Sequence, residues 1–149
     1  EARRKRFDVR GRGDGLLVGA AGGMAREGFV PFATPYAVFA SRRAYDFICM
    51  ASAEDNLNVK IVGGLPGLTT GYGPSHQATD ALAIFRAMPN LMIVDPCDAR
   101  EIEQAVPAIA AHQGPVHVTL LRGHVPVVLD EHRYPFASGN APPPRTGPR

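Results

Sequence analysis

Short apolar runs alternate with longer amphipathic stretches along this chain of 149 residues. Four continuous apolar runs, each bounded by Gly, Pro or polar residues, predict strands over residues 29–34, 58–62, 91–94 and 116–121. Helical spacing of the apolar positions between them predicts helices that begin near residues 15, 35, 75 and 98. This alternation predicts an α/β fold, a three-layer sandwich in which helices cover both faces of a mainly parallel sheet.

The predicted helices differ in character. Small apolar residues and three glycines fill the first, which is expected to pack tightly and to end near Gly28. The second begins at Pro35 and reaches residue 51. Ser75 is expected to cap the third, and the fourth runs from Asp98 with a disturbance at Pro107. The pattern ends near residue 129, which predicts a basic segment over 1–14, an α/β domain over 15–129 and a linker or tail over 130–149.

Loops at the carboxyl ends of parallel strands meet at one edge of the sheet, where ligands of such folds bind. Those loops are expected at residues 34–36, 63–75, 95–98 and 122–124. The second contains a glycine-rich stretch that ends at His76. Glycines let a ligand approach the backbone, and an imidazole can exchange a proton near neutral pH. We therefore expect this edge to hold the functional site; the competing interpretation is a capping loop with an exposed histidine.

Composition and charge exclude several classes of protein. Hydrophobic residues make up 45% and charged residues 20%, as in a domain with a single core. No apolar run reaches the roughly 18 residues that a membrane span requires, and no hydrophobic segment typical of a secretory signal follows the basic N-terminus, so we expect a cytoplasmic protein with no membrane partner. The excess of basic residues behind the net charge of +2 lies near the two termini, and basic terminal segments can bind nucleic acid. We interpret them as solvated ends and expect no nucleic-acid partner. The histidines and the two cysteines lack metal-ligand spacing, so no metal site is expected in this chain.

Two motifs carry a resemblance to a known family. The segment Gly-Pro-Ser-His-Gln-Ala-Thr-Asp-Ala-Leu-Ala-Ile-Phe-Arg-Ala-Met-Pro-Asn (73–90), followed by Asp-Pro-Cys-Asp (95–98), resembles the pyrimidine-binding domain of transketolases. The resemblance covers roughly residues 16 to 136. It implies thiamine diphosphate and a divalent metal, usually Mg²⁺, as cofactors, and transfer of a two-carbon ketol unit between sugar phosphates. It also implies an active site between chains, in a homodimer or in a heteromer whose other subunit binds the diphosphate and the metal.

The resemblance assigns roles to individual residues. Tyr36 and Phe39 match the aromatic positions that pack against the pyrimidine ring of the cofactor, although both also fit the core face of their helix. Arg42 stands where many relatives have a third aromatic residue in this cofactor-binding pocket. His76 matches the catalytic histidine that lies over the reactive thiazolium carbon and hydrogen-bonds substrate hydroxyls.

The catalytic glutamate of the family, which bonds the pyrimidine N1′, has no direct counterpart. Aligned backward from residues 17–19 its position falls on Asp14, and aligned forward from residues 7–9 it falls on Gly13. We take Asp14 as the candidate, one methylene shorter than glutamate. The unusual segment around it is consistent with degeneration, a changed reading frame or a genuine variant.

Several functional hypotheses follow from the resemblance. The chain is expected to act as a pyrimidine-binding subunit or fragment of a transketolase-like enzyme and not to turn over substrate alone. Alternatives are an enzyme like deoxyxylulose-phosphate synthase or like a dehydrogenase E1 component, and a degenerate domain used for dimerisation or regulation.

Overall fold

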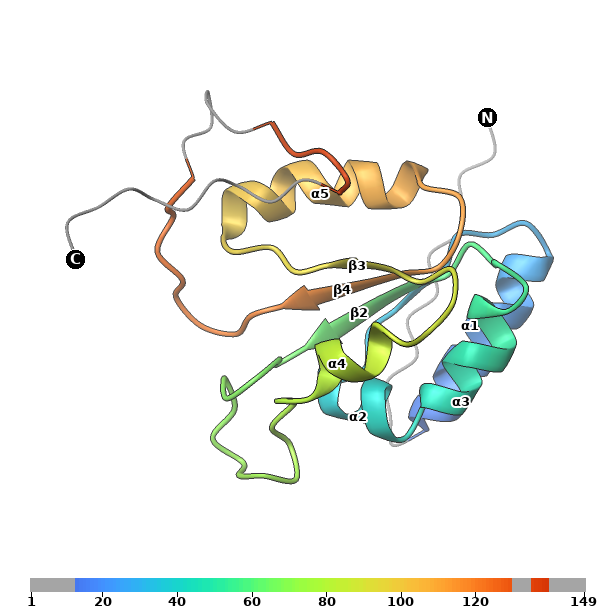
Figure 1. Ribbon diagram of the computed structural model, residues 1–149, viewed down its shortest axis with the longest axis horizontal. Coiled ribbons are helices and arrows are strands. Elements are labelled where there is room, and N and C mark those ends of the chain that lie inside the picture. Colours follow the sequence, from blue (N-terminus) through green and yellow to red (C-terminus); the bar gives the residue numbers. More distant parts are fainter. Residues whose placement is uncertain (1–12, 130–134, 140–149) are drawn as a thin grey trace.

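The computed structural model describes residues 13–129 and 135–139 and forms an α/β domain (Figure 1). Its strands are β1 (Phe32–Ala33), β2 (Lys60–Gly64), β3 (Met92–Val94) and β4 (Val116–Leu120). All pair in parallel, in the order β1-β2-β4-β3. The helices are α1 (Asp14–Arg26), α2 (Ala37–Arg42), α3 (Tyr45–Ile48), the π-helix η1 (Cys49–Ala53), α4 (Ala81–Phe85) and α5 (Ala99–Ala111).

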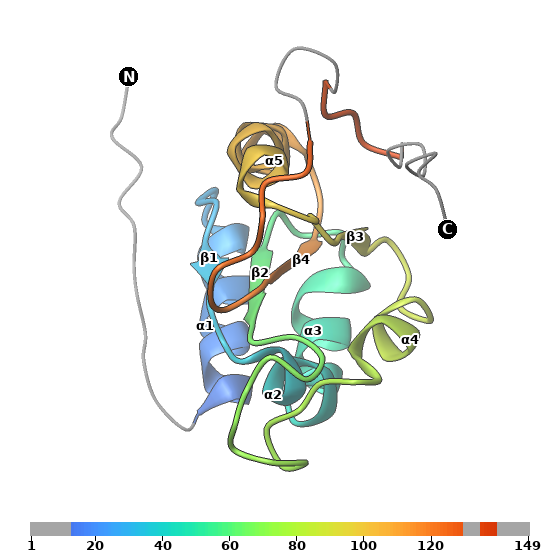
Figure 2. The same cartoon turned by 90° about the vertical axis from the view of Figure 1, so that its left-hand side faces the viewer.

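The helices form two layers on opposite faces of the sheet. Helix α5 covers one face, and α1 to α4 cover the other (Figures 1 and 2). This arrangement confirms the predicted three-layer α/β fold with a parallel sheet. Because every strand points the same way, the loops after β1, β2 and β3 open on one edge, as the sequence predicted.

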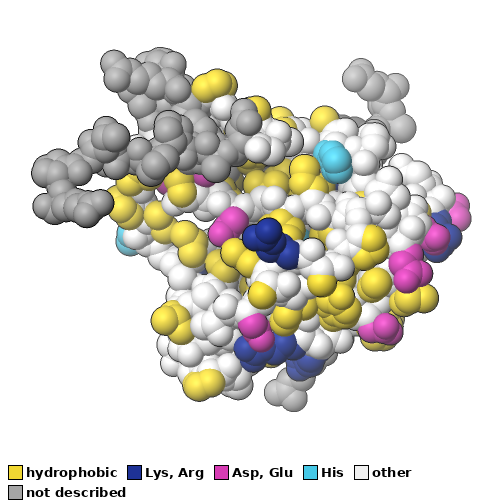
Figure 3. Space-filling model, in the orientation of Figure 1, with side chains coloured by type: hydrophobic (Ala, Val, Ile, Leu, Met, Phe, Trp, Pro, Cys, Tyr) yellow, Lys and Arg dark blue, Asp and Glu magenta, His cyan; other side chains and the backbone are white. Residues whose placement is uncertain are grey.

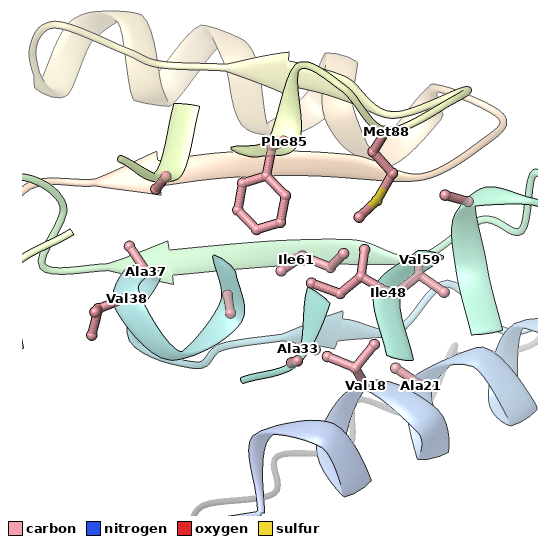
Figure 4. Close-up of a cluster of buried hydrophobic side chains, with 14 of the residues drawn as sticks. Val18, Ala21, Ala33, Ala37, Val38, Ile48, Val59, Ile61, Phe85 and Met88 are labelled. Carbon is pink, nitrogen blue, oxygen red and sulfur yellow. The ribbon is translucent and has the colours of Figure 1, made fainter. Parts of the chain in front are cut away.

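A separate hydrophobic core fills the space on each side of the sheet. The larger one packs α1 to α4 against the sheet and includes Val18, Ile48, Ile61, Phe85 and Met88. These side chains point toward one another from α1, α3, β2, α4 and the turn that follows α4 (Figure 4). The smaller core lies under α5 and consists of Val94, Ala105, Ile109, Val116 and Val118.

Close packing of α1 explains its small residues. A Cβ atom on Gly22 would overlap the carbonyl oxygen of Ala51, and one on Gly15 would lie 2.7 Å from the ring of Phe47. Larger residues at these positions would push α1 away from α3 and η1. The predicted tight packing of this helix is therefore present.

The predicted helix over residues 35–51 is interrupted. It forms α2, α3 and η1 because the backbone N–H groups of Arg43 and Ala44 both bond to the carbonyl oxygen of Phe39, at 3.1 and 2.9 Å. The bond from Ala44 spans five residues, where a regular α-helix spans four, and it ends α2 and turns the chain before α3 begins. Apolar spacing alone does not show such a break, since the buried face continues through it.

Other boundaries also differ from the prediction. Strand β2 lies two residues later than expected, because Gly63 and Gly64 pair with Thr119 and Leu120. Only two residues of the predicted 29–34 strand pair with the sheet. The disturbance expected at Pro107 does not end the helix: α5 continues through this residue, with the buried Ala105 and Ile109 on either side of it, although proline has no N–H to donate within the helix.

The predicted terminal segments lie largely outside the described residues, apart from Gly13, Asp14 and residues 135–139. Within the described part of the chain, none of the helices has the length and apolar character needed to cross a bilayer.

Candidate functional site

The ends of β1 and β2 bring two loops together at the carboxyl edge of the sheet. Tyr36 forms an isolated parallel bridge with Gly64, and the N–H of Gly64 donates to the carbonyl of Pro35 at 3.0 Å. These bonds fix the start of α2 beside the loop that follows β2. The same loop is closed at its base by two reciprocal bonds of 3.1 Å between Gly67 and Ala78.

An aromatic cluster lies where these segments meet. The rings of Tyr36 and Phe39 are stacked, with centroids 5.8 Å apart and planes 18° from parallel. The imidazole of His76 approaches both rings edge-on, at 6.3 Å from Tyr36 and 5.2 Å from Phe39. Three residues that the sequence singled out separately therefore form one group, which we call the aromatic cluster together with Tyr72.

Tyr72 is a member of the cluster that sequence reasoning missed. Its ring lies 5.3 Å from that of His76, and its backbone N–H donates to the hydroxyl of the buried Thr70 at 3.3 Å. The signal was present in the sequence, since Tyr72 stands between two glycines of the loop that was already identified. An aromatic residue in a glycine-rich loop, close before a candidate catalytic histidine, could have been included on that ground.

Ser75 orients the imidazole of His76. The sequence predicted Ser75 as a helix cap, but α4 begins only at Ala81, and the Ser75 hydroxyl lies 2.9 Å from Nδ1 of His76 instead. Residues 73–76 form a turn because the N–H of His76 bonds to the carbonyl of Gly73, whose φ is +80°. Ser75 thereby occupies one ring nitrogen of His76 and fixes the plane of the ring.

Asp14 lies at the first position of α1 and is buried, with 5% of its surface exposed. Its Oδ2 accepts a hydrogen bond of 2.6 Å from the guanidinium of Arg43. The same guanidinium lies over the ring of Phe39, with Cζ 3.7 Å from the ring centroid. Arg43 therefore connects the candidate carboxylate to the aromatic cluster. No role was predicted for Arg43 from the sequence, although its spacing of four residues from Phe39 was the available signal.

Arg42 points to a different carboxylate. Its Nε and NH2 atoms donate to the two oxygens of Asp80, at 3.2 and 3.0 Å, and NH2 also contacts the carbonyl of Gln77 at 3.4 Å. The hydrogen bond from Arg42 lowers the pKa of Asp80. These contacts tie the start of α4 to α2. The role of Arg42 in binding a cofactor ring stays a prediction.

The chemistry of these groups suits a flat, uncharged heterocycle that carries a basic ring nitrogen. Aromatic rings bind such a ring by stacking, and a carboxylate in a poorly solvated place forms a strong bond with a nitrogen that is protonated. The aromatic cluster and Asp14 supply both kinds of group, and Arg43 joins them. The residues present therefore fit the aminopyrimidine ring that the resemblance implies.

Metal chemistry has no comparable basis in the described residues, where no group of three His, Cys, Asp or Glu side chains could hold an ion. Cys97 lies at the same edge of the sheet, after β3. Burial, together with the neighbouring Glu101, raises the pKa of its thiol to about 11, which disfavours the thiolate that binds metals.

Comparisons with known proteins agree with this description. The family model for the transketolase pyrimidine-binding domain matches residues 16–127. An uncharacterised transketolase family protein of Sinorhizobium fredii is 67% identical over 136 residues, which are 91% of this chain and 39% of that protein. A 6-deoxy-6-sulfo-D-fructose transketolase subunit of a Clostridium species is 36% identical, over 84% of this chain and 39% of that subunit.

A solved structure with a similar fold is that of a split-gene transketolase, described as an inactive β4 tetramer. It superposes with a TM-score of 0.75 at 36% identity and covers 85% of this chain and 40% of its own. The chain thus spans about two fifths of the length of the relatives that it matches.

Proposed function

Because the chain belongs to the family of transketolase pyrimidine-binding domains, we propose that it forms the half of a thiamine diphosphate site that receives the aminopyrimidine ring. The observation that carries this proposal is the aromatic cluster joined through Arg43 to the buried Asp14. We take residues 15–129 as the domain responsible, flanked by the segments 1–14 and 130–149.

The reaction proposed for the complete enzyme is transfer of a two-carbon ketol unit between sugar phosphates. A partner, either a second subunit or another part of a longer chain, would bind the diphosphate and Mg²⁺. A homodimer or a heteromer would place the site between chains, and we propose a cytoplasmic location. When bound, thiamine diphosphate supplies a thiazolium carbon that can lose its proton and carry the two-carbon unit.

Each residue of this chain has a definite task in that reaction. Tyr36 and Phe39 bind the flat face of the pyrimidine and exclude water from it. Asp14 holds a proton at the ring atom N1′, where an ionised carboxyl favours the protonated ring. His76, oriented by Ser75 at Nδ1, is left with Nε2 to exchange a proton with a substrate hydroxyl.

One feature favours a second candidate function. Asp14 stands where the resemblance implies a longer glutamate, and a displacement of about 1 Å in a reacting group can cost on the order of a hundredfold in rate. A domain that keeps the fold for dimerisation or regulation, without catalysis, would tolerate this change. The alternatives resembling deoxyxylulose-phosphate synthase or a dehydrogenase E1 component differ in the donor, which would be a 2-oxo acid.

Reconstitution tests these possibilities. The full chain is mixed with a diphosphate-binding transketolase subunit, thiamine diphosphate, Mg²⁺ and a ketose phosphate donor, and transfer to an aldose phosphate is measured. We expect transfer that requires every component and falls at least a hundredfold in His76→Ala, while His112→Ala, at the C-terminal end of α5 and away from this edge of the sheet, changes nothing. Activity only with pyruvate as donor would favour the alternative enzymes. Absence of both activities and of cofactor binding would favour the non-catalytic domain.

A further inference from the structure

Two adjacent arginines at the end of α2 bind carboxylates on different elements. Arg42 pairs with the exposed Asp80, whereas Arg43 pairs with the buried Asp14 of α1 and also stacks on Phe39. No role was expected for Arg43 from the sequence. Because it touches both the candidate carboxylate and an aromatic ring of the proposed site, its contacts bear directly on how that site is held.

Burial gives the first reason why Arg43 matters. The Asp14 side chain is 6% exposed, and an ionised carboxylate in such a place needs a charged or hydrogen-bonding partner to remain there. Arg43 provides one through a bond of 2.6 Å to Oδ2. Its own side chain is 49% exposed, so its charge keeps contact with water while its planar end reaches inward.

Geometry gives the second reason. A guanidinium is flat, and stacking on the Phe39 ring at 3.7 Å fixes the plane in which its N–H groups lie. The direction of the bond to Asp14 is then fixed as well. That bond uses Oδ2, and Oδ1 accepts no hydrogen bond from the residues that the structure describes, so Oδ1 is left for a ring nitrogen. A short aspartate held in this way has a defined orientation despite its missing methylene.

We propose that Arg43 is a positioning residue that sets the Asp14 carboxylate against the aromatic cluster for contact with the aminopyrimidine ring. This inference rests on the proposed function, since it names what aims the carboxylate of that same site. Arg43 acts through Asp14 and Phe39 and does not itself exchange a proton with the ring.

A double-mutant cycle tests the inference without any turnover. The probe is 4-amino-5-hydroxymethyl-2-methylpyrimidine, which carries the ring but no diphosphate, and its dissociation constant is measured by NMR titration of the full chain. We expect Arg43→Ala to weaken binding about tenfold in the native background, but less than threefold in an Asp14→Asn background, where no carboxylate remains to be aimed. Arg43→Lys should restore part of the loss, because it keeps the charge but not the flat stacked group. Arg26→Ala, which removes an exposed arginine paired with Asp55, is the matched control and should leave binding unchanged.

A wild-type measurement covers the case in which Arg43→Ala does not fold. Addition of the pyrimidine should shift the side-chain Nε–H resonance of Arg43 and not that of Arg26. A tenfold loss in both backgrounds would show that Arg43 acts through the fold and would overturn the inference, as would unchanged or tighter binding in Arg43→Ala. If the wild-type chain shows no shift with the pyrimidine at all, the proposed function itself fails and the inference with it.

Discussion

The carboxylate of Asp98 accepts a hydrogen bond of 2.7 Å from the backbone N–H of Val128, thirty positions further along the chain. The same oxygen accepts a bond of 2.8 Å from Leu129, and the other oxygen caps α5 through the N–H of Glu101 at 3.0 Å. Burial alone would raise the pKa of Asp98, but these backbone donors outweigh it and lower the pKa. One aspartate thus fastens the segment after β4 to the start of α5.

Asp98→Ala should therefore cost more than the loss of an ordinary cap. We expect a loss of about 2 to 4 kcal/mol in the free energy of unfolding, because a cap and two charge-assisted bonds disappear together. Hydrogen exchange should show faster exchange of the Val128 and Leu129 amides. Asp55→Ala, at an exposed and ion-paired aspartate, serves as control and should change stability by less than about 1 kcal/mol. Unchanged exchange at Val128 in Asp98→Ala would contradict the fastening role.

Stability should fall in mild acid because of His117. This residue is fully buried in β4 against Phe85, its ring nitrogens lack hydrogen-bond partners among the described residues, and burial lowers its pKa to about 4. In the unfolded chain the imidazole of His117 is protonated as the pH falls below about 6.5, whereas in the folded chain it is protonated only below about pH 4. Stability is therefore lost as the pH falls between these values. The expected loss, on the order of 3 kcal/mol, is measured by urea unfolding across that range.

Replacement of the ring isolates this effect. His117→Leu removes two unsatisfied buried nitrogens and should give a flatter stability profile between pH 4 and 6.5, whereas the exposed His124→Gln should keep the native profile. An equally steep profile in His117→Leu would assign the acid sensitivity to other groups.

The two adjacent glycines of α1 offer a matched pair. Gly22 faces Ala51, while a Cβ on Gly23 would meet nothing within 4 Å. Gly22→Ala should lower the free energy of unfolding by about 1 to 3 kcal/mol, because α1 must move away from η1. Gly23→Ala should raise it by up to about 1 kcal/mol through helix propensity. The free energies of unfolding of both variants are measured by thermal unfolding. Equal changes in the two variants would contradict the requirement for glycine at position 22 where α1 approaches η1.

Catalysis should depend on the carboxyl at position 14. In the reconstituted complex, Asp14→Ala should abolish ketol transfer, whereas Asp14→Glu should preserve or raise it, because glutamate restores the length that the resemblance implies. Steady-state transfer rates with the partner subunit and Mg²⁺ present would measure both. An alanine variant as active as the native chain would remove Asp14 from the mechanism.

The thiol of Cys97 should react slowly with alkylating agents. Burial and the neighbouring carboxylates raise its pKa to about 11, so the reactive thiolate is scarce at pH 8. In a Cys49→Ala background, which leaves a single thiol, mass spectrometry should show alkylation by iodoacetamide much slower than that of free cysteine. Glu101→Gln should speed the reaction by removing one of the negative charges. Rapid labelling of Cys97 in the chain with Glu101 intact would contradict the raised pKa of its thiol.

The fold class was predictable because strand and helix periods alternate cleanly, and a parallel sheet then places its loops on one edge without further information. The residues at which individual helices begin and end were harder to predict from the sequence. The break between α2 and α3 depends on which N–H groups reach the carbonyl of Phe39, and Ser75 bonds a neighbouring imidazole in place of a helix N–H. In each case the chain forms one of two nearly equivalent hydrogen bonds, and the spacing of apolar residues does not indicate which one.

The candidate site was predictable in part for a similar reason. Tyr36, Phe39 and His76 come from motifs with a recognisable pattern, and the structure brings them together. The distinction between Arg42 and Arg43 depends on the interruption of the helix, which turns one side chain toward α4 and the other toward α1. On the molecular surface charged side chains lie among many hydrophobic ones (Figure 3). An arginine with a structural task is therefore not distinguished by its residue type alone.

The strand order has a consequence for how the chain acquires its shape during synthesis. Strand β4 is the last in sequence, yet it lies between β2 and β3 and joins the two halves of the sheet. Until residue 120 has left the ribosome, β3 has no neighbour to pair with and β2 exposes one edge. The sheet therefore cannot be completed until β4 has been synthesised. A nascent chain that stops short of β4 presents open strand edges to chaperones.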